Sequence, residues 1–301
     1  MSGHPAAAQL AVEPFFDADS ATWSYLLHDA STGDCALIDP VLDFDAASGR
    51  CTTASAQRLL DRVAELGARM QWILETHVHA DHLSAAAWLR RRTGARIGIG
   101  TRVVDVRHAF GKLLADPELG AGELPFDRLF ADGDVIQVGR VPLRVWSTPG
   151  HTPACVTYVL ESGAVQGLAA GAAFVGDTLF MPDCGSARCD FPGGDAHALY
   201  RSAQRLLSLP PETQLYFCHD YPPAGRAARF GTTVADQRAN NIHLGRARSQ
   251  DEFVRLRTAR DAALALPRLL WPSVQVNARA GDLPAPVSGG GRFLRLPVSL
   301  G

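Results

Sequence analysis

The chain has 301 residues, of which 47% are hydrophobic, so it is long enough for one large domain or two smaller ones with a substantial core. Its 29 lysines and arginines nearly balance 31 acidic residues, and the formal charge of -2 gives no reason to expect a nucleic-acid partner. No apolar run is long enough to span a bilayer, and the start of the chain lacks the basic and apolar regions of a signal peptide. Six irregularly spaced cysteines fit a reducing compartment. We therefore expect a cytoplasmic protein with no membrane partner.

Short runs of β-prone residues recur along the first 220 positions. They lie at 23–27, 35–38, 72–75, 97–99, 135–138, 143–147, 156–160, 172–176 and 214–218. Apolar residues at helical spacing lie between them, at 59–66, 83–89 and 199–207. Strands and helices that are mixed in this way predict one layered α/β domain over residues 1–235.

The pattern changes after residue 235. A helical stretch continues through residue 241, an arginine-rich helix is expected over about 251–266, and a Pro/Gly-rich tail follows. Acidic residues interleave with the arginines, which is typical of a solvated helix face. We expect residues 236–301 to form a C-terminal extension packed on the same domain, and we assign it no chemistry.

The segment 76–82 holds three histidines and an aspartate at HxHxDH spacing. These residues are His77, His79, Asp81 and His82. Alternation along an extended segment places His77 and His79 on one side, and the following turn can return Asp81 and His82 to the same point. Imidazole and carboxylate ligands together suit zinc or iron, so the segment predicts a metal site.

Three further candidate ligands follow apolar strands. His151 comes after a Pro-Gly turn, Asp177 follows the buried run that ends at Gly176, and His219 follows the run that ends at Cys218. Strand ends of this kind would deliver all three side chains to one edge. The remaining histidines fall outside the pattern and are interpreted as surface or packing residues, namely His4, His28, His108, His197 and His243.

The order HxHxDH, His151, Asp177, His219 resembles the metallo-β-lactamase superfamily over roughly residues 10–235. The resemblance implies an α/β fold, an αββα sandwich of two mixed sheets flanked by helices. It also implies that all seven side chains meet in one cleft. Superfamily membership alone does not fix the reaction.

Within the superfamily, the segments 25–27, 38–41, 76–82, 147–153 and 188–191 are similar to those of the persulfide dioxygenases. Segments 191–194 and 275–277 also resemble a bacterial subgroup of β-lactamase-like hydrolases. The resemblance implies oxidation of glutathione persulfide, or a related small persulfide, with O2 to sulfite and thiol in sulfide detoxification. The family also suggests a homodimer.

This family binds one iron(II), which the resemblance assigns here to His77, His151 and Asp177. Two histidines and one carboxylate leave open positions on an octahedral iron for O2 and sulfur. The other ligand-type residues would then orient ligands and water, or hold a second metal, and they are His79, Asp81, His82 and His219.

The resemblance also points to residues beside the metal. Arg188 matches a position that contacts substrate, although an ion pair with Asp190 is an alternative role. Tyr200 matches a position near iron, where it would contact substrate and act in catalysis together with Asp81, but it also belongs to a helical core stripe. Cys184 occupies a family cysteine position, and we assign it no redox role.

Three other functions compete with the dioxygenase. A thioester hydrolase similar to glyoxalase II would use the same motif with two zinc ions and an activated water. A lactonase is a third choice. A non-catalytic sensor of sulfide or metal is an alternative from a different class, although no DNA-reading motif supports it.

Overall fold

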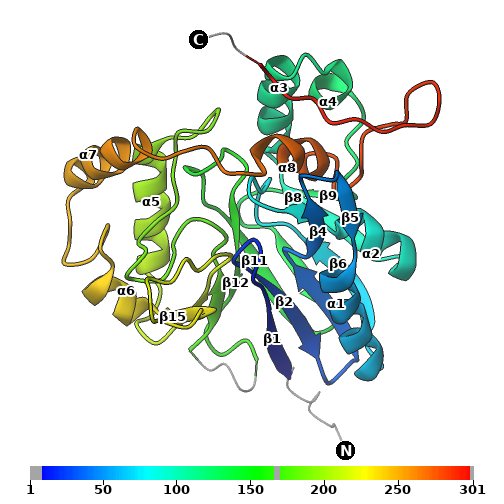
Figure 1. The fold of residues 1–301 in the computed structure, drawn as a ribbon. Helices are drawn as coiled ribbons and strands as arrows, with labels where there is room; N and C mark the ends of the chain where they lie inside the picture. Colours follow the sequence, from blue (N-terminus) through cyan, green and yellow to red (C-terminus); the bar gives the residue numbers. More distant parts are fainter. Residues whose placement is uncertain (1–8, 166–169, 299–301) are drawn as a thin grey trace, which may run out of the picture.

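The structure is a computed structural model that describes residues 9–165 and 170–298. Two six-stranded sheets face each other, and helices cover their outer faces (Figure 1). The layers therefore follow the order helices, sheet, sheet, helices. This confirms the αββα sandwich of two mixed sheets that the sequence predicts.

The first sheet has the strand order β1-β2-β3-β6-β8-β9. Its strands are β1 (Leu10–Asp17), β2 (Thr22–Asp29), β3 (Asp34–Ile38), β6 (Arg69–Leu74), β8 (Arg96–Gly100) and β9 (Arg128–Phe130). β1, β2 and β3 pair antiparallel, whereas β3, β6, β8 and β9 pair parallel. Because parallel strands end at the same edge of a sheet, the loops that follow β3 and β6 emerge side by side.

The second sheet has the order β10-β11-β12-β13-β14-β15. Its strands are β10 (Val135–Val138), β11 (Val141–Ser147), β12 (Val156–Leu160), β13 (Ala172–Phe174), β14 (Gln214–Tyr216) and β15 (Gly231–Thr233). Only the β13 and β14 pair is parallel. A small antiparallel sheet joins β5 (Arg50–Thr52), β4 (Val41–Asp45) and β7 (Leu83–Ser84).

Helices form the two outer layers. Over the first sheet lie α1 (Ala54–Glu65), α2 (Ala86–Thr93), α3 (Val103–Leu113), α4 (Pro117–Ala121) and α8 (Leu270–Asn277). Over the second lie α5 (Ala196–Leu207), α6 (Val234–Asn240) and α7 (Gln250–Asp261). None of these described helices is long and apolar enough to cross a membrane.

Strand alternation explains how one sheet serves two cores. On β2, Tyr25 and Leu27 point into the core between the sheets, while Leu26 points into the core beneath the helices. β3 repeats the pattern with Ile38 between the sheets and Leu37 on the helix side. Both faces of the first sheet are therefore buried, which accounts for its nearly continuous apolar runs.

The extension after residue 235 packs into both outer layers. α7 contacts α5 on one side of the molecule, and α8 contacts β7 on the other (Figure 1). Phe253 of α7 shares a core cluster with Leu199 of α5, and Val274 of α8 shares one with Leu83 of β7. α7 ends at Asp261, earlier than the expected residue 266, and α8 is a helix that the pattern did not predict.

Candidate metal centre

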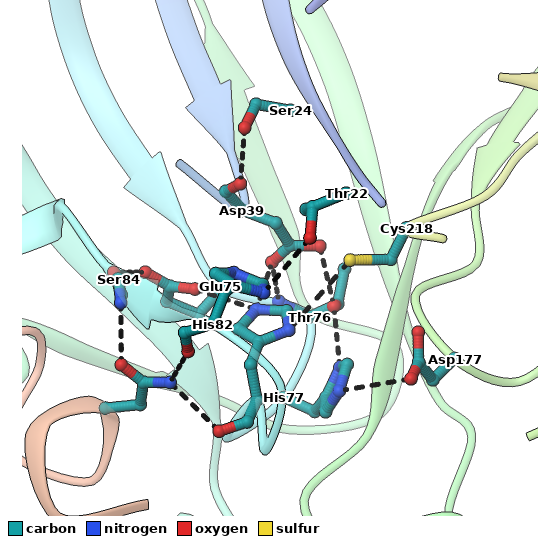
Figure 2. A network of polar contacts seen from close by, with 12 residues as sticks. Thr22, Ser24, Asp39, Glu75, Thr76, His77, His82, Ser84, Asp177 and Cys218 are labelled. Atoms are coloured by element: carbon teal, nitrogen blue, oxygen red, sulfur yellow. Dashed lines mark hydrogen bonds and ion pairs between the residues drawn. The ribbon is translucent and has the colours of Figure 1, made fainter. Parts of the chain in front are cut away.

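The HxHxDH segment begins where β6 ends, and Asp39 at the end of β3 anchors it. Asp39 has φ of 50°, a conformation that turns the chain sharply after the strand. Its carboxylate accepts hydrogen bonds from the Thr76 backbone nitrogen and from Thr76 Oγ1, both at 2.8 Å (Figure 2). The neighbouring parallel strands β3 and β6 thus fix the entry into the motif.

A first ligand group consists of His77, His151 and Asp177, all buried. The Nε2 atoms of His77 and His151 each lie 3.7 Å from Asp177 Oδ2, and Figure 2 shows His77 directed at Asp177. Among the described residues neither Nε2 atom has a hydrogen-bond partner. Buried polar atoms without a partner are rare in native proteins, so these three side chains fit a metal ion.

The other ring nitrogens show which tautomer each histidine adopts. His151 Nδ1 lies 2.6 Å from the carbonyl oxygen of Arg188, which can only accept, so Nδ1 carries the proton. Thr76 Oγ1 donates its proton to Asp39 and therefore accepts from His77 Nδ1 at 3.0 Å. Both Nε2 atoms are thereby left with a free lone pair, as a metal ligand requires.

A second ligand group consists of His79, Asp81, His82 and His219. Asp81 Oδ2 lies 2.9 Å from His219 Nε2, and Asp81 Oδ1 lies 3.2 Å from His82 Nδ1. His82 Nε2 is buried and has no hydrogen-bond partner within the described part of the chain. Three imidazoles and one carboxylate are a donor set that zinc and iron both accept.

Two carboxylates behind the motif orient His79. Its Nε2 atom lies 3.0 Å from Asp39 Oδ1 and 3.1 Å from Glu75 Oε2. Nε2 therefore carries a proton, and Nδ1 is the nitrogen left for a metal. Burial opposes the charge on His79, but Asp39 and Glu75 raise its pKa well above the ordinary value, so a metal ion that binds at Nδ1 must displace a proton from it.

The remaining electrostatics of the site favour a bound cation. Burial, followed by repulsion from His79, lowers the pKa of His77 well below its ordinary value and keeps the imidazole neutral. Burial raises the pKa of Asp177. A buried carboxylate is costly to ionise unless a cation neutralises it, so the donor set fits a metal ion.

A cavity of about 630 Å³ opens onto the ligands. Asp81, His151 and Asp177 form its inner end. Most residues of its walls come from the loops after β13 and β14 and from the C-terminal extension, with Asp19 and Ser20 added from the turn between β1 and β2. The first set includes Phe180, Cys184, Arg188, Phe191, Tyr221, Ile242, Arg260, Leu264 and Arg268. A small molecule can therefore reach the ligands along a path that the extension helps to form.

The structure places the three expected accessory residues differently. Arg188 lines the cavity, but its guanidinium forms a bidentate pair with Asp190 at 2.6 and 2.7 Å and donates to the Ala265 carbonyl at 2.7 Å. Its alternative role as an ion pair is thus the one observed here. Cys184 also lines the cavity, and burial with nearby negative charge raises its pKa to about 11, so it stays a thiol.

Tyr200 is a correction to the expected site. Its hydroxyl donates to the Arg248 carbonyl at 2.9 Å and its ring packs against Phe253 of α7. The extension covers that face of α5, which is why Tyr200 belongs to a helix contact and not to the cavity wall.

Sequence reasoning missed four residues of the site. Asp39 and Glu75 stand at strand ends, so the rule that found His151 could have found them. Tyr221 follows His219 closely and was a detectable neighbour of the ligand. Asn277 lies in segment 275–277, which resembles the β-lactamase-like hydrolases, but nothing local shows that it bonds to the motif from the far end of the chain.

The fold and the two ligand groups define a metal-binding αββα protein. A model of the metallo-beta-lactamase superfamily matches residues 18–219, and the chain belongs to this superfamily. The two His/Asp groups are metal-binding sites typical of its fold.

The names of similar proteins refer to two kinds of reaction, hydrolysis and oxidation. A "probable metallo-hydrolase" of Burkholderia pseudomallei is 56% identical over 96% of this chain and 99% of the relative. "Glyoxylase B2" of Dictyostelium discoideum is 42% identical over 96% of this chain and 97% of the relative. "Persulfide dioxygenase ETHE1, mitochondrial" of Bos taurus is 31% identical over 91% of this chain and 90% of the relative. The crystal structure of ETHE1 from Myxococcus xanthus has a TM-score of 0.71 at 30% identity, covering 90% of this chain and 100% of that one.

Proposed function

We propose that the chain is a metal-dependent hydrolase that holds two metal ions and cleaves a thioester of an anionic thiol such as glutathione. The observation that carries the proposal is the position of Asp177. Its Oδ2 atom lies 3.7 Å from both histidines of the first group, while its Oδ1 atom lies 3.6 Å from His219 of the second. A carboxylate with one oxygen toward each group is suited to share two ions.

The two groups have distinct parts in this proposal. Bound metal ions would supply an activated water nucleophile and polarise the thioester carbonyl. His77 and His151 present Nε2 atoms that have no hydrogen-bond partner among the described residues, and Asp177 contributes the charge between the groups. Asp81 accepts a hydrogen bond from the Tyr221 hydroxyl at 3.0 Å, which holds the carboxylate at the open face of the site.

The walls of the cavity support an anionic substrate. Arg260 and Arg268 line it and are exposed, and neither lies within ion-pair distance of a carboxylate in the described part of the chain. Ile242 and Leu264 add apolar surface beside them. A ligand with carboxylates and a short apolar arm, as in a glutathione thioester, fits this mixture of guanidinium and aliphatic groups. The name "Glyoxylase B2" of a relative at 42% identity agrees with it.

A second candidate is the persulfide dioxygenase that the sequence favours. The specific observation for it is that His77, His151 and Asp177 form a separate group, with His79 among the other ligands. Such a triad suits a single iron(II) ion, which when bound would supply the activation of O2. The relative of this name is more distant, at 31% identity, and this is why we rank the dioxygenase second.

One experiment separates the two functions. The protein is purified anaerobically, its metal content is measured, and hydrolysis of a glutathione thioester is compared with O2 uptake on glutathione persulfide. About two metal ions per chain with thioester cleavage and no O2 uptake support the hydrolase. About one iron per chain with persulfide-dependent O2 uptake would replace it with the dioxygenase.

A further inference from the structure

Asn277, the last residue of α8, makes two hydrogen bonds to the backbone of the metal-binding segment and one to the backbone of β7, which follows it. Its Nδ2 atom donates to the carbonyl oxygens of His79 at 2.9 Å and His82 at 2.7 Å, and its Oδ1 atom accepts from the Ser84 nitrogen at 2.7 Å. The side chain is 4% exposed. One buried amide thus uses both donors and its acceptor to hold one turn of the chain.

These bonds belong to a closed ring that passes through a ligand. The Ser84 hydroxyl donates to Glu75 Oε1 (Figure 2). Glu75 Oε2 contacts His79 Nε2 at 3.1 Å. Asn277 then connects the His79 carbonyl back to the Ser84 nitrogen. The ring fixes His79 from its backbone and its imidazole together, and it leaves His79 Nδ1 facing the second group.

The first ligand group is anchored by other partners. His77 is held through Thr76 and Asp39, and His151 is held by the Arg188 carbonyl. None of the bonds that Asn277 makes to the described residues reaches His77, His151 or Asp177. Loss of the Asn277 amide should therefore affect the two groups unequally.

We propose that Asn277 is a positioning residue that holds the second ligand group in a metal-binding arrangement, so that the C-terminal extension completes the second metal site but not the first. The inference rests on the two-metal site of the proposed function. It goes beyond that function because it assigns control of one ion to a helix outside residues 18–219, the part that the superfamily model matches.

The test is zinc binding by the full metal-free chain. Zn²⁺ is titrated against a chromophoric chelator, and Co²⁺ absorption reports the ligand field at each site. Asn277→Ala removes all three bonds, and Asn277→Asp keeps the acceptor for Ser84 while it removes both donors. Both variants should weaken the second ion about 10- to 100-fold, the range for lost supporting bonds at metal sites, and leave the first within about twofold.

Gln275→Ala is the matched control. Gln275 is a buried amide on the same helix, and it bonds to the Trp271 and Arg295 carbonyls instead of the metal-binding segment. This variant should lower the melting temperature and keep both zinc affinities. If Asn277→Ala fails to fold, Asn277→Asp gives the comparison.

The outcomes that overturn the inference differ from those that overturn the function. Unchanged affinity for the second ion in the Asn277 variants, or equal weakening of both ions, refutes the role of Asn277 and leaves the two-metal site standing. A wild-type chain that binds a single zinc removes the two-metal function, and the inference falls with it.

Discussion

The hydroxyl of Tyr221 donates a hydrogen bond of 3.0 Å to Asp81 Oδ2, and its ring stacks on His219 with 5.6 Å between centroids and 14° between planes. Tyr221 is 49% exposed as a residue, but burial of its hydroxyl and the negative charge of Asp81 raise its pKa, so the hydroxyl keeps its proton and remains a donor. Tyr221 therefore contacts two ligands of the second group from the side of the cavity.

Replacing Tyr221 by phenylalanine separates the hydrogen bond from the stacking. Tyr221→Phe keeps the ring on His219 and leaves Asp81 with one contact fewer. Hydrogen bonds to charged groups contribute about 1.5 to 3 kcal/mol when buried, and half-exposure reduces this, so we expect kcat to fall about 3- to 10-fold. Steady-state kinetics with saturating metal measure the effect.

Tyr200→Phe is the control for this change. It removes a hydrogen bond to the Arg248 carbonyl away from the cavity, and it should reduce the free energy of unfolding by about 1 kcal/mol without a change in kcat. A large loss of kcat in Tyr200→Phe, with Tyr221→Phe unaffected, would restore Tyr200 as the catalytic tyrosine.

Arg260 and Arg268 should set substrate affinity. Each is expected to contribute about 0.2 to 1 kcal/mol as an exposed partner of a substrate carboxylate, so Arg260→Ala and Arg268→Ala should each raise KM about 1.4- to 5-fold and leave kcat unchanged. Increasing ionic strength should reduce the difference from the wild type. The kinetic constants are measured for the single variants and the double variant.

Arg255→Ala is the matched control, because Arg255 is an exposed arginine of α7 that does not line the cavity. Arg188→Ala differs from the Arg260 and Arg268 variants, since it also breaks the ion pair with Asp190 and the hydrogen bond to the Ala265 carbonyl. We expect Arg188→Ala to lower stability and substrate affinity with metal retained. Loss of metal from it would contradict the position of Arg188.

Metal binding should stabilise the fold through the first group. A ligand at a hundred times its dissociation constant adds about 2.7 kcal/mol to the free energy of unfolding, so zinc or iron(II) should raise the melting temperature of the metal-free chain. His151→Ala should abolish most of that shift and either enzymatic activity. His108→Ala, at an exposed histidine of α3, should keep both. A full metal-induced shift in His151→Ala would remove His151 from the ligands.

The sequence predicts much of this fold because its signals are local. Alternating burial marks strands such as β10, and the Pro149-Gly150 turn marks the position of His151 after a strand end. The same reasoning finds all seven ligand-type side chains, because each follows an apolar strand or lies in the HxHxDH segment. These strand ends come from both sheets, from β6 of the first and from β11, β13 and β14 of the second, and only the parallel pair β13 and β14 has its ends brought together by parallel pairing.

What the sequence could not predict depends on long-range packing. Asn277 lies 195 positions from His82, and a single asparagine in a helix has no pattern that shows its partners. Arg257 belongs to a helix with the charge pattern of a solvated face, yet it is 2% exposed and bonds to Asp261 and the Ser186 carbonyl. Charges spaced four residues apart look the same whether the pair is exposed or buried.

His243 should make stability depend on pH. Its Nδ1 atom accepts a hydrogen bond from the Ser186 nitrogen at 3.0 Å, which requires an unprotonated nitrogen. Burial, followed by repulsion from Arg257, lowers the pKa of His243 from 6.5 to about 3. Between pH 6.5 and pH 3 the unfolded chain binds a proton at His243 more readily than the folded chain does. The stabilisation from unprotonated His243 is therefore complete above pH 6.5 and is lost as pH falls toward 3.

At pH 5 the loss from this one group is at most about 2 kcal/mol. His243→Asn places an amide oxygen near the position of Nδ1 as an acceptor for Ser186 and removes the titration. Chemical unfolding of metal-free wild type and variant at pH 7 and pH 5 gives two pH differences, and subtracting them cancels the other histidines. We expect the wild type to lose more stability than His243→Asn by about that amount, whereas equal losses would mean that His243 is protonated in the folded chain as readily as in the unfolded one.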